Sequence, residues 1–398
     1  MNIQEKNNEG LLALQLGNNV EAEEAFFECL KHDDKSPQLW YNLGLAKFRQ
    51  DMFEEAEECF VKAAGLALPD PATYPCQPYP EAWEMVGASQ IEQRKFREAF
   101  RSLIYAGTAE GKALIGQIRL GEGGDPKYAM GWFEHRHKEE NTWDGKESLI
   151  GKTLLIEGTE GLGDQIFFAR WLRRVAELGA ERVYLKVSEP LTVLFDNDFS
   201  GSFILTQTPP ATDYYTNLGS LGYIFEDGIG TIPTAPYISN IWYENECPLY
   251  RIGLAWSGNI LHLNDKRRSI PLPFFQPLLD MEYKFTCVQK DVRAGDADYM
   301  QYTDIEKEDI EDVDHLSEVI SGRDLIITVD TLTANLAGAM GIPAWVLVPY
   351  GCDWRWMFEG DRTPWYPSVR VFRQGDDRRW EPVIEKVCEE LKKLGEQQ

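Results

Sequence analysis

The 398-residue sequence has few basic residues for its size and no long hydrophobic run. It carries 40 Lys and Arg against 65 Asp and Glu, which gives a formal net charge of −25. A surface this acidic repels nucleic-acid phosphates and anionic lipid headgroups, so neither is an expected partner. No uninterrupted apolar run reaches the roughly 18 residues of a membrane span, and no signal-peptide pattern opens the chain. We therefore expect a protein that does not insert into membranes.

Cysteine and histidine are also scarce. The seven cysteines are scattered, odd in number and without a C-x-x-C pair. This argues against a disulfide framework and predicts free thiols in a reducing compartment, which indicates a cytoplasmic location. His135 and His137 stand two positions apart, so on a helix they diverge and make a poor metal pair. We predict no metal and no other bound cofactor.

An internal repeat occupies the N-terminal part. Gly10 recurs 34 residues later as Gly44, and Gly44 recurs 43 residues later as Gly87. The nine extra residues of the second step fall in a proline-rich stretch, residues 68–80, where a loop belongs. The second repeat carries the full set of small and large residues: Trp40, Leu43, Gly44, Ala56, Phe60 and Ala63. This pattern resembles the tetratricopeptide repeat, in which small residues let two antiparallel helices cross closely.

Three such repeats cover about residues 7–111, and residues 128–137 are expected to add a capping helix. We predict a repeat domain over residues 1–147. Such an array serves either as a scaffold or as a groove that binds a peptide or protein partner.

The pattern changes to alternating strand and helix at Gly151. An apolar run at residues 153–157 predicts a buried strand, residues 165–175 predict a helix, and residues 183–187 predict the next strand. Such a βαβ unit forms a parallel sheet, whose ligands bind at the carboxyl ends of the strands. The glycine-rich turn after the first strand has neither the G-x-G-x-x-G spacing nor the Lys and Ser of a Walker loop.

This turn ends in Gly161-Leu162-Gly163-Asp164. Gly161 and Gly163 let the backbone approach a ligand, and the helix start that follows favours anions. Asp164 has two interpretations. Taken alone, the segment favours a helix cap, because Asp accepts N–H bonds at a helix start. At the mouth of a cleft between lobes, Asp164 would instead be a general base for an acceptor hydroxyl.

A second α/β region follows. Its strands are predicted at residues 251–256, 284–289, 324–329, 344–348 and 369–372, with a closing helix at 382–394. We assign residues 148–240 to a first Rossmann-like lobe and residues 241–398 to a second. The predicted fold class is therefore a helical repeat array followed by a pair of α/β lobes.

Three consecutive cations interrupt this acidic chain just before Ser269: Lys266, Arg267 and Arg268. They would suit a diphosphate, with Lys as a point charge, Arg as a bidentate donor and Ser as a neutral donor. A solvated basic loop is the alternative.

Asp330 and Thr331 mark a second anion-favouring position, where a strand ends and a helix of small residues begins. They are either plain helix caps or part of a ligand site at the sheet edge. Aromatic residues follow the next strand: Trp354, Trp356, Trp365 and Tyr366. These rings either stack on a base or sugar or fill the interface between the lobes.

The order of these motifs resembles that of bacterial tetratricopeptide-repeat proteins whose C-terminal part is similar to heptosyltransferases (the ADP-heptose:lipopolysaccharide family). More distantly, it is similar to that of protein O-linked N-acetylglucosamine transferases. The motifs are Gly161-Leu162-Gly163-Asp164, Trp256-Ser257-Gly258-Asn259, His262-x-Asn264-Asp265-x-x-Arg268-Ser269, Asp330-Thr331 with Leu336-Ala337-Gly338-Ala339, and Asp353-Trp354-Arg355-Trp356. The resemblance covers nearly the whole chain and implies the GT-B fold, with a nucleotide-sugar donor bound mainly by the second lobe.

The resemblance also implies roles for individual residues. Asp164 becomes the base, and Asp330 reaches the donor sugar. The residues expected to bind the donor nucleotide and its phosphates are Gly161, Gly163, Ser257, Asn259, Lys266, Arg268, Ser269, Gln289, Thr331 and Asn335. Enzymes of this fold usually need no metal, because protein cations and helix dipoles stabilise the leaving diphosphate.

One departure matters, since relatives often have His at the position of Asn335. Asn forms hydrogen bonds but cannot shuttle a proton near neutral pH. Two functions follow. The first is an inverting, metal-independent glycosyltransferase acting on a protein or glycan acceptor that the repeats help to present. The second is a GT-B scaffold of little activity that recruits a protein through its repeats. Asp164, Arg268 and Asp330 favour the enzyme, and Asn335 favours the scaffold.

Overall fold

The computed structural model describes residues 2–66, 79–124, 141–228, 230–239, 251–262 and 264–396. They belong to two compact units, residues 1–120 and 121–398, which we describe separately. The predicted capping helix at 128–137, with His135 and His137, lies outside the described residues. The same holds for the predicted boundary between the lobes at residues 240 and 241. The five described cysteines are buried and unpaired.

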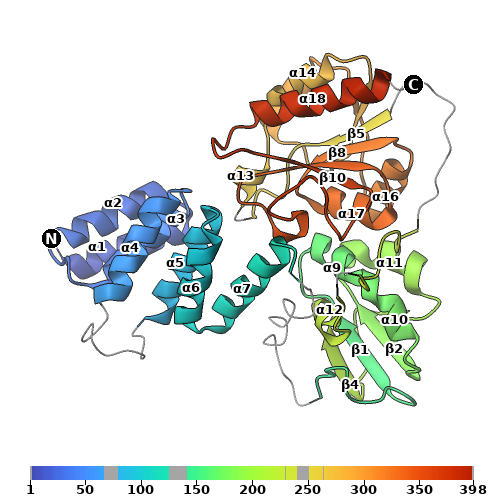
Figure 1. Cartoon of the computed structure of the whole chain (residues 1–398), viewed down its shortest axis with the longest axis horizontal. Helices are drawn as coiled ribbons and strands as arrows, with labels where there is room; N and C mark the ends of the chain where they lie inside the picture. The colour runs from blue at the N-terminus through green and yellow to red at the C-terminus, as the bar shows by residue number, and fades with distance from the viewer. Residues whose placement is uncertain are drawn as a thin grey trace. The chain divides into compact units, whose positions relative to one another are not determined.

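The first unit is the predicted array of helical hairpins (Figure 1). Its helices are α1 (Ile3–Gln15), α2 (Asn19–Leu30), α3 (Pro37–Phe48), α4 (Phe53–Leu66), α5 (Pro80–Glu92), α6 (Phe96–Ala106) and most of α7 (Ala109–Gly121). Helix α3 begins as the sequence dictates, because the Ser36 hydroxyl accepts the Leu39 N–H at 3.4 Å and Pro37 occupies the first turn. The tetratricopeptide prediction is confirmed.

The repeated glycines let the two helices of each hairpin touch. A Cβ added at Gly10 would lie 2.7 Å from the Phe26 ring, and one added at Gly44 would lie 2.7 Å from Phe60. At Gly87 the added atom would meet Leu103 at 2.5 Å. Because real side chains do not approach this closely, only glycine fits these positions against the large residue of the second helix.

Polar bonds between side chains join successive repeats. The Glu57 carboxylate accepts the Gln90 side-chain amide at 2.7 Å, the Gln93 amide at 2.8 Å and the Lys95 ammonium at 3.1 Å. Although burial opposes it, these hydrogen bonds lower the pKa of Glu57. One repeat earlier, Glu23 accepts from the next hairpin in the same manner.

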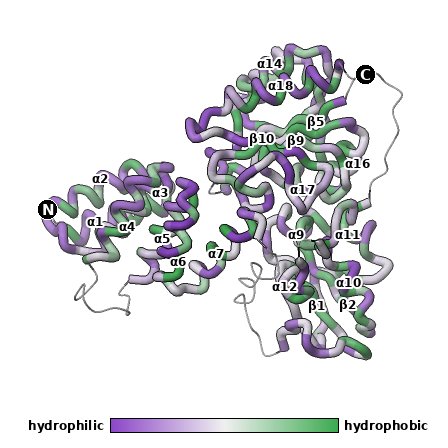
Figure 2. Tube along the Cα trace, viewed as in Figure 1, coloured by the Kyte–Doolittle hydropathy of each residue, from purple (hydrophilic) through white to green (hydrophobic). Residues whose placement is uncertain are grey.

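The first lobe of the second unit contains a four-stranded parallel sheet in the order β3-β2-β1-β4. The strands are β1 (Thr153–Glu157), β2 (Arg182–Lys186), β3 (Ile204–Leu205) and β4 (Tyr214–Asn217), and the main helices are α9 (Leu162–Phe168), α10 (Leu172–Ala176), α11 (Thr192–Phe199) and α12 (Leu221–Ile224). Figure 2 shows hydrophobic residues along the labelled strands β1 and β2, in which every second residue is buried.

The second lobe contains a six-stranded parallel sheet in the order β10-β9-β8-β5-β6-β7. Its strands are β5 (Arg251–Ala255), β6 (Lys284–Cys287), β7 (Glu306–Lys307), β8 (Leu325–Val329), β9 (Ala344–Val348) and β10 (Val369–Arg373). Its helices are α13 (Asp265–Arg268), α14 (Gln276–Leu279), α15 (Ala294–Met300), α16 (Val313–Ser321), α17 (Leu332–Met340) and α18 (Glu381–Glu396). The apolar side of α18 packs on this sheet in one buried cluster.

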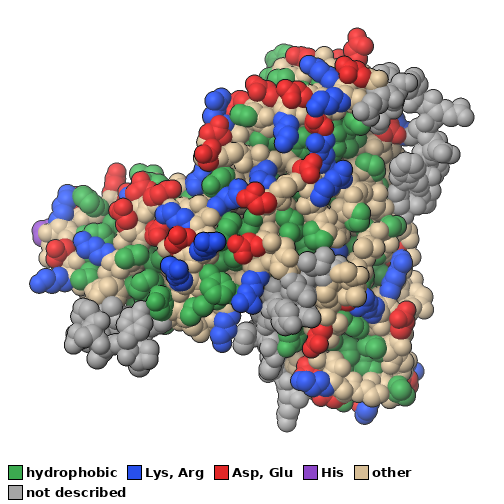
Figure 3. All heavy atoms as spheres, in the orientation of Figure 1, with side chains coloured by type: hydrophobic (Ala, Val, Ile, Leu, Met, Phe, Trp, Pro, Cys, Tyr) green, Lys and Arg blue, Asp and Glu red, His purple; other side chains and the backbone are tan. Residues whose placement is uncertain are grey.

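A helical repeat array followed along the chain by two parallel α/β lobes confirms the predicted fold class. Each strand predicted from an apolar run is present, with ends that move by one or two residues. The short strands β3, β4 and β7 were not predicted. The predicted helix at 165–175 is interrupted by a 3-10 turn at Ala169–Trp171. In the described part of the chain, no helix combines the length and the apolar character needed to cross a bilayer. The face drawn in Figure 3 shows acidic and basic side chains interspersed.

Arg170 fastens the first lobe to the second. Its side chain is 1% exposed, and it donates to the Phe167 carbonyl at 2.9 Å, the Trp365 carbonyl at 3.0 Å and the Tyr237 hydroxyl at 3.3 Å. The guanidinium also lies 4.1 Å from the Phe167 ring and 5.0 Å from the Tyr366 ring. Aromatic faces attract a cation, so the rings help to stabilise this buried charge.

Candidate functional site

The glycine-rich turn after β1 is held by a buried glutamine. The Gln165 amide nitrogen donates to the Glu160 carbonyl at 2.6 Å and the Ser188 hydroxyl at 2.8 Å. Its oxygen accepts the Ser188 N–H at 2.9 Å. A Cβ added at Gly158 would lie 2.7 Å from this oxygen, so the glycine leaves space for the Gln165 side chain. The turn is thereby fixed against the start of α9.

Asp164 does not cap α9, contrary to the interpretation that the local sequence favoured. The cap position is Gly161, and no side chain caps the helix. The Asp164 carboxylate instead forms an ion pair with Arg355 of the second lobe. Its side chain keeps 37% exposure, whereas that of Arg355 keeps 12%. A cation from the second lobe therefore fixes one oxygen of Asp164, while the side chain stays accessible.

Arg355 is itself tightly held. Its guanidinium donates to Asp353 at 3.0 Å and stacks 4.8 Å from the Phe167 ring and 4.7 Å from the Trp354 ring. Its carbonyl accepts the Thr363 hydroxyl at 2.6 Å. The nearby carboxylates outweigh burial and raise the pKa of Arg355, so this guanidinium stays charged.

The aromatic residues of this region fill the interface between the lobes. Trp354 is 3% exposed, Trp365 1%, and Trp356 and Tyr366 are fully buried. Phe167 of the first lobe meets the Trp354 ring at 5.3 Å and the Trp365 ring at 5.2 Å. Of the two interpretations given above, the structure supports packing rather than stacking on a ligand.

The loop after β5 is built on Gln289. Its oxygen accepts the Trp256 N–H at 2.9 Å and the Ser257 N–H at 3.2 Å. Its nitrogen donates to the Ser257 hydroxyl at 3.1 Å and to the Asp291 carbonyl at 3.0 Å. All four hydrogen-bonding positions of this amide are therefore used within the chain. Gln289 positions Ser257 and has no group left for the donor, which it was predicted to bind.

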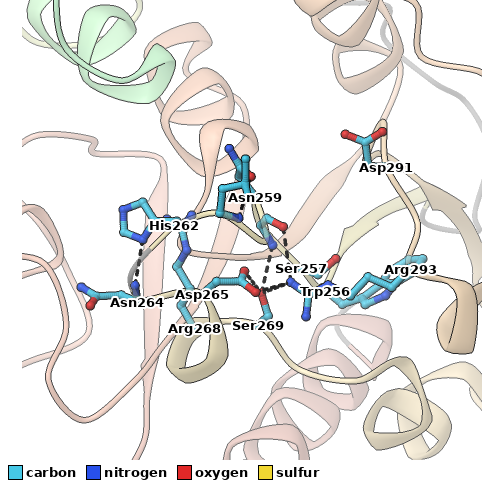
Figure 4. A network of polar contacts seen from close by, with 12 residues as sticks. Trp256, Ser257, Asn259, His262, Asn264, Asp265, Arg268, Ser269, Asp291 and Arg293 are labelled. Atoms are coloured by element: carbon cyan, nitrogen blue, oxygen red, sulfur yellow. Dashed lines mark hydrogen bonds and ion pairs between the residues drawn. The ribbon is translucent and has the colours of Figure 1, made fainter. Parts of the chain in front are cut away.

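Ser269 lies inside a second network, which Figure 4 shows beneath the loop. Its hydroxyl donates to Asp265 at 2.7 Å and accepts the Gly258 N–H at 3.0 Å. Arg293 donates to the same Asp265 carboxylate at 2.6 Å and to Ser269 at 3.1 Å. With 6% exposure, Ser269 supports the loop from within and does not face a ligand.

The three basic side chains of α13, Lys266, Arg267 and Arg268, have different surroundings. The Arg268 guanidinium donates to the Asp330 carbonyl at 3.0 Å, and a Cβ added at Gly258 would meet it at 2.9 Å. Arg267 instead donates to the Asn264 side chain. Lys266 is exposed on the same helix. Arg268 therefore carries its charge to the start of α17.

The start of α17 carries no side-chain cap. Thr331 stands at the cap position, but its hydroxyl lies 3.3 Å from the Thr328 hydroxyl and accepts no N–H of the helix. The first amides of this helix are thus left for an anion, within the described chain. Burial and the neighbouring Asp353 carboxylate raise the pKa of Asp330 to about 6, against the opposing effect of Arg268.

Asn335 belongs to the contact between the lobes. Its nitrogen donates to the Thr331 carbonyl at 3.2 Å and its oxygen accepts the Tyr366 hydroxyl at 3.1 Å. A Cβ added at Gly163 would meet the Asn335 nitrogen at 3.1 Å, so α9 and α17 touch here through a glycine. The Asn335 amide is thus engaged by the chain on both its nitrogen and its oxygen.

The structure brings most of the predicted residues to one region. Asp164 and Gly163 come from the first lobe, whereas Arg268, Asp330 and Thr331 come from the second. Asn259 is exposed and accepts the Leu261 N–H at 2.9 Å in the loop above them. Across the described ranges, no three His, Cys, Asp or Glu side chains lie close enough together to hold a metal ion.

Two site residues were missed, although both stand in motifs that were recognised. Arg355 reaches Asp164 across 191 positions of sequence, and no local pattern predicts such a partner. His262 stands in the loop that leads into α13, and burial and Arg268 lower its pKa whereas Asp164 raises it. Its place in the loop between Asn259 and Arg268 was the only available signal.

Comparisons with known proteins give remote relatives. No family model matches this chain. Protein FlbA of Caulobacter vibrioides is 25% identical over 288 residues, which are 63% of this chain and 48% of FlbA. The chain thus spans about half the length of that curated relative.

Solved structures similar to this chain include glycosyltransferases. A glycosyl transferase family 9 protein of Veillonella parvula is 12% identical over 63% of this chain and 99% of its own, with a TM-score of 0.46. An O-GlcNAc transferase of Thermobaculum terrenum is 12% identical over 99% of this chain and 91% of its own, with a TM-score of 0.35. Both are proteins of the types that the sequence motifs resemble.

Proposed function

We propose that the second unit is a glycosyltransferase that moves a sugar from a nucleotide-sugar donor to a hydroxyl acceptor. The observation that carries the proposal is the convergence of two chemically different groups. An accessible carboxylate, Asp164, comes from the first lobe, and a cation at an uncapped helix start, Arg268 beside Thr331, comes from the second. Glycosyl transfer needs a base on one side of the reacting carbon and an anion site on the other.

The donor side would bind the diphosphate. Arg268 supplies a positive charge at the start of α17, and the uncapped first amides of that helix supply N–H donors there. Lys266, exposed on α13, is proposed to add a second positive charge. As the bond from the anomeric carbon to the diphosphate oxygen breaks, negative charge grows on that oxygen. Fixed cations and helix amides stabilise this charge without a metal ion, which is why we propose a metal-independent reaction.

The acceptor side would use Asp164. One carboxylate oxygen binds Arg355, so the other is the one placed to accept the acceptor proton. A Cβ added at Gly161 would lie 3.0 Å from this second oxygen, and the glycine therefore leaves space there. The acceptor oxygen attacks the anomeric carbon, its proton passes to Asp164, and the diphosphate leaves from the opposite face. This sequence inverts the anomeric configuration.

The acceptor is proposed to be a protein or a glycan, with the tetratricopeptide helices as the means of presenting it. Arrays of this kind bind extended partners along their concave surface. The inter-repeat bonds at Glu57 keep adjacent hairpins in register, as a binding surface requires.

A ligand screen tests the proposal. The intact protein is incubated with UDP-, GDP-, ADP- and CMP-sugars, and both the melting temperature and sugar release are measured. A ligand at 100 times its Kd should stabilise the fold by about 2.7 kcal/mol. Arg268→Lys should weaken the binding of the active donor at least tenfold, because a bidentate donor is lost. The neighbouring Arg267→Lys is the matched control and should bind normally.

No melting shift with any of these donors would overturn the proposal. Binding without sugar release or transfer, in wild type, would identify the chain as the scaffold of little activity instead.

A further inference from the structure

Backbone hydrogen bonds on both sides hold His262 in place within its exposed loop. Its N–H donates to the Asn259 carbonyl at 3.0 Å, and its carbonyl accepts the Asp265 N–H at 2.9 Å. The Asn259 side chain also accepts the Leu261 N–H at 2.9 Å, which closes the turn before it. Figure 4 shows the imidazole projecting from this loop, on the side away from Asp291.

The bonding of the ring fixes its tautomer. The Nδ1 atom of His262 accepts the Asn264 N–H at 3.1 Å, so Nδ1 carries no proton. The proton of the neutral ring must then stand on Nε2. Within the described chain, this Nε2–H has no hydrogen-bond acceptor. The loop therefore presents one oriented N–H donor.

The charges around His262 come from both lobes. Partial burial and Arg268 lower the pKa of His262, Arg267 acts in the same direction, and Asp164 and Asp265 oppose them in part. The lowered pKa favours the neutral ring, whose donor is Nε2–H. The ring belongs to the loop that leads directly into α13, the helix that carries Arg268, the proposed diphosphate cation (Figure 4).

We infer that His262 is a donor-contact residue, whose Nε2–H binds an oxygen of the nucleoside diphosphate portion of the substrate. The inference rests on the proposed function and adds to it a neutral hydrogen-bond donor beside Arg268. No proton is transferred: the imidazole keeps its proton, and the growing charge on the phosphate strengthens the bond. If Nδ1 were protonated, its N–H would face the backbone N–H of Asn264, and the hydrogen bond between them would be lost. The ring therefore binds the substrate in its neutral form.

Nitrogen NMR tests this directly, because the chain has only five histidines. The ring nitrogens of the ¹⁵N-labelled protein are recorded with and without saturating ADP, UDP, GDP or CDP, and His262→Gln assigns the signals. We expect the Nε2–H tautomer in the free protein and a shift of its Nε2 and Hε2 signals with the nucleotide that binds. His315 is the internal control, because its Nδ1 also accepts a backbone N–H, from Glu311 at 3.3 Å. Its signals should stay in place.

Binding measurements with two variants complete the test. His262→Ala should raise the Kd of the bound nucleoside diphosphate about 10- to 100-fold, as expected for a lost hydrogen bond to a charged group. His262→Gln keeps an N–H donor and should recover much of the affinity, and His315→Ala should change nothing. Nucleotide binding that leaves the His262 signals unmoved, or full affinity in His262→Ala, would overturn this inference while the proposed function stands. Failure of every nucleoside diphosphate to bind wild type would overturn both.

Discussion

Replacing Asp330 by Asn should make the second unit more stable at neutral pH while it impairs donor binding. Burial and the neighbouring Asp353 raise the pKa of Asp330 from 3.8 to about 6. A shift of that size corresponds to about 3 kcal/mol, at roughly 1.4 kcal/mol per unit. The cost arises because the folded protein must hold this carboxylate in its charged form, close to a second negative charge. Sites that bind ligands often carry such a cost.

The direction of the pH dependence follows from proton binding. Between about pH 4 and pH 6 the folded state binds more protons at Asp330 than the unfolded state does, so wild-type stability falls as the pH rises. The loss continues as the pH passes the folded pKa of about 6 and is nearly complete by about pH 7. The neutral amide introduced by Asp330→Asn resembles the protonated acid and does not show this loss. The variant should therefore gain up to about 3 kcal/mol at pH 8 and nothing at pH 4.

Urea unfolding followed by tryptophan fluorescence is a suitable assay, since all of the tryptophans except Trp40 and Trp83 belong to the second unit. Unfolding curves are recorded at pH 4, 6 and 8 for wild type, Asp330→Asn and the control Asp298→Asn, which changes an exposed carboxyl of α15. The control should follow wild type at every pH. A gain in Asp330→Asn that is the same at pH 4 and pH 8, or a loss at pH 8, would refute the reasoning.

Three further substitutions test the packing and charges described above. Gly163→Val should destabilise the second unit by about 1–3 kcal/mol in urea unfolding, because even a Cβ at this position would lie 3.1 Å from the Asn335 nitrogen. An unchanged urea midpoint would contradict the contact of α9 with α17. Arg355→Met should destabilise the second unit by about 3 kcal/mol in the same assay, because it removes the ion-pair partner of Asp164 and Asp353. The control Arg362→Met, at an exposed position in the same loop, should cost less than about 0.5 kcal/mol. Equal losses of stability in the two variants would show that the ion pairs contribute little. Glu57→Gln should destabilise the repeats by about 1 kcal/mol at pH 7. Because the folded pKa of Glu57 is lowered, that difference should shrink in circular-dichroism melts as the pH falls below about 4, and a difference that persists at pH 3 would contradict the assigned bonds.

The parts of the fold that follow from local sequence were predictable. The spacing of Gly10, Gly44 and Gly87 predicts the helical hairpins, because each glycine must face a large residue of the partner helix. Apolar runs such as 325–329 predict the buried strands. The two-residue strands β3 and β7 were not predictable, since their length is set by the neighbour to which they bind and not by a pattern of their own.

The region of the candidate site could be predicted from the sequence, but the role of each side chain in it could not be predicted. Ser269 and Gln289 stand at positions where ligand contacts were expected, yet the side chains of both form hydrogen bonds within the protein. Asp164 resembles a helix cap until its partner Arg355 is known, and that partner lies 191 positions away. Hydrogen-bond partners depend on tertiary packing, so residue type and spacing predict a region but not a role.

The turnover of Asp164→Asn tests the central claim most directly. With the nucleotide sugar that binds best, the variant should bind within a few-fold of wild type, because the donor contacts come from the second lobe. Its rate of sugar transfer should fall by about 10²- to 10⁴-fold, the usual contribution of a general base. The urea midpoint of the variant serves as the control for folding. A normally folded Asp164→Asn protein that transfers sugar at the wild-type rate would contradict the account.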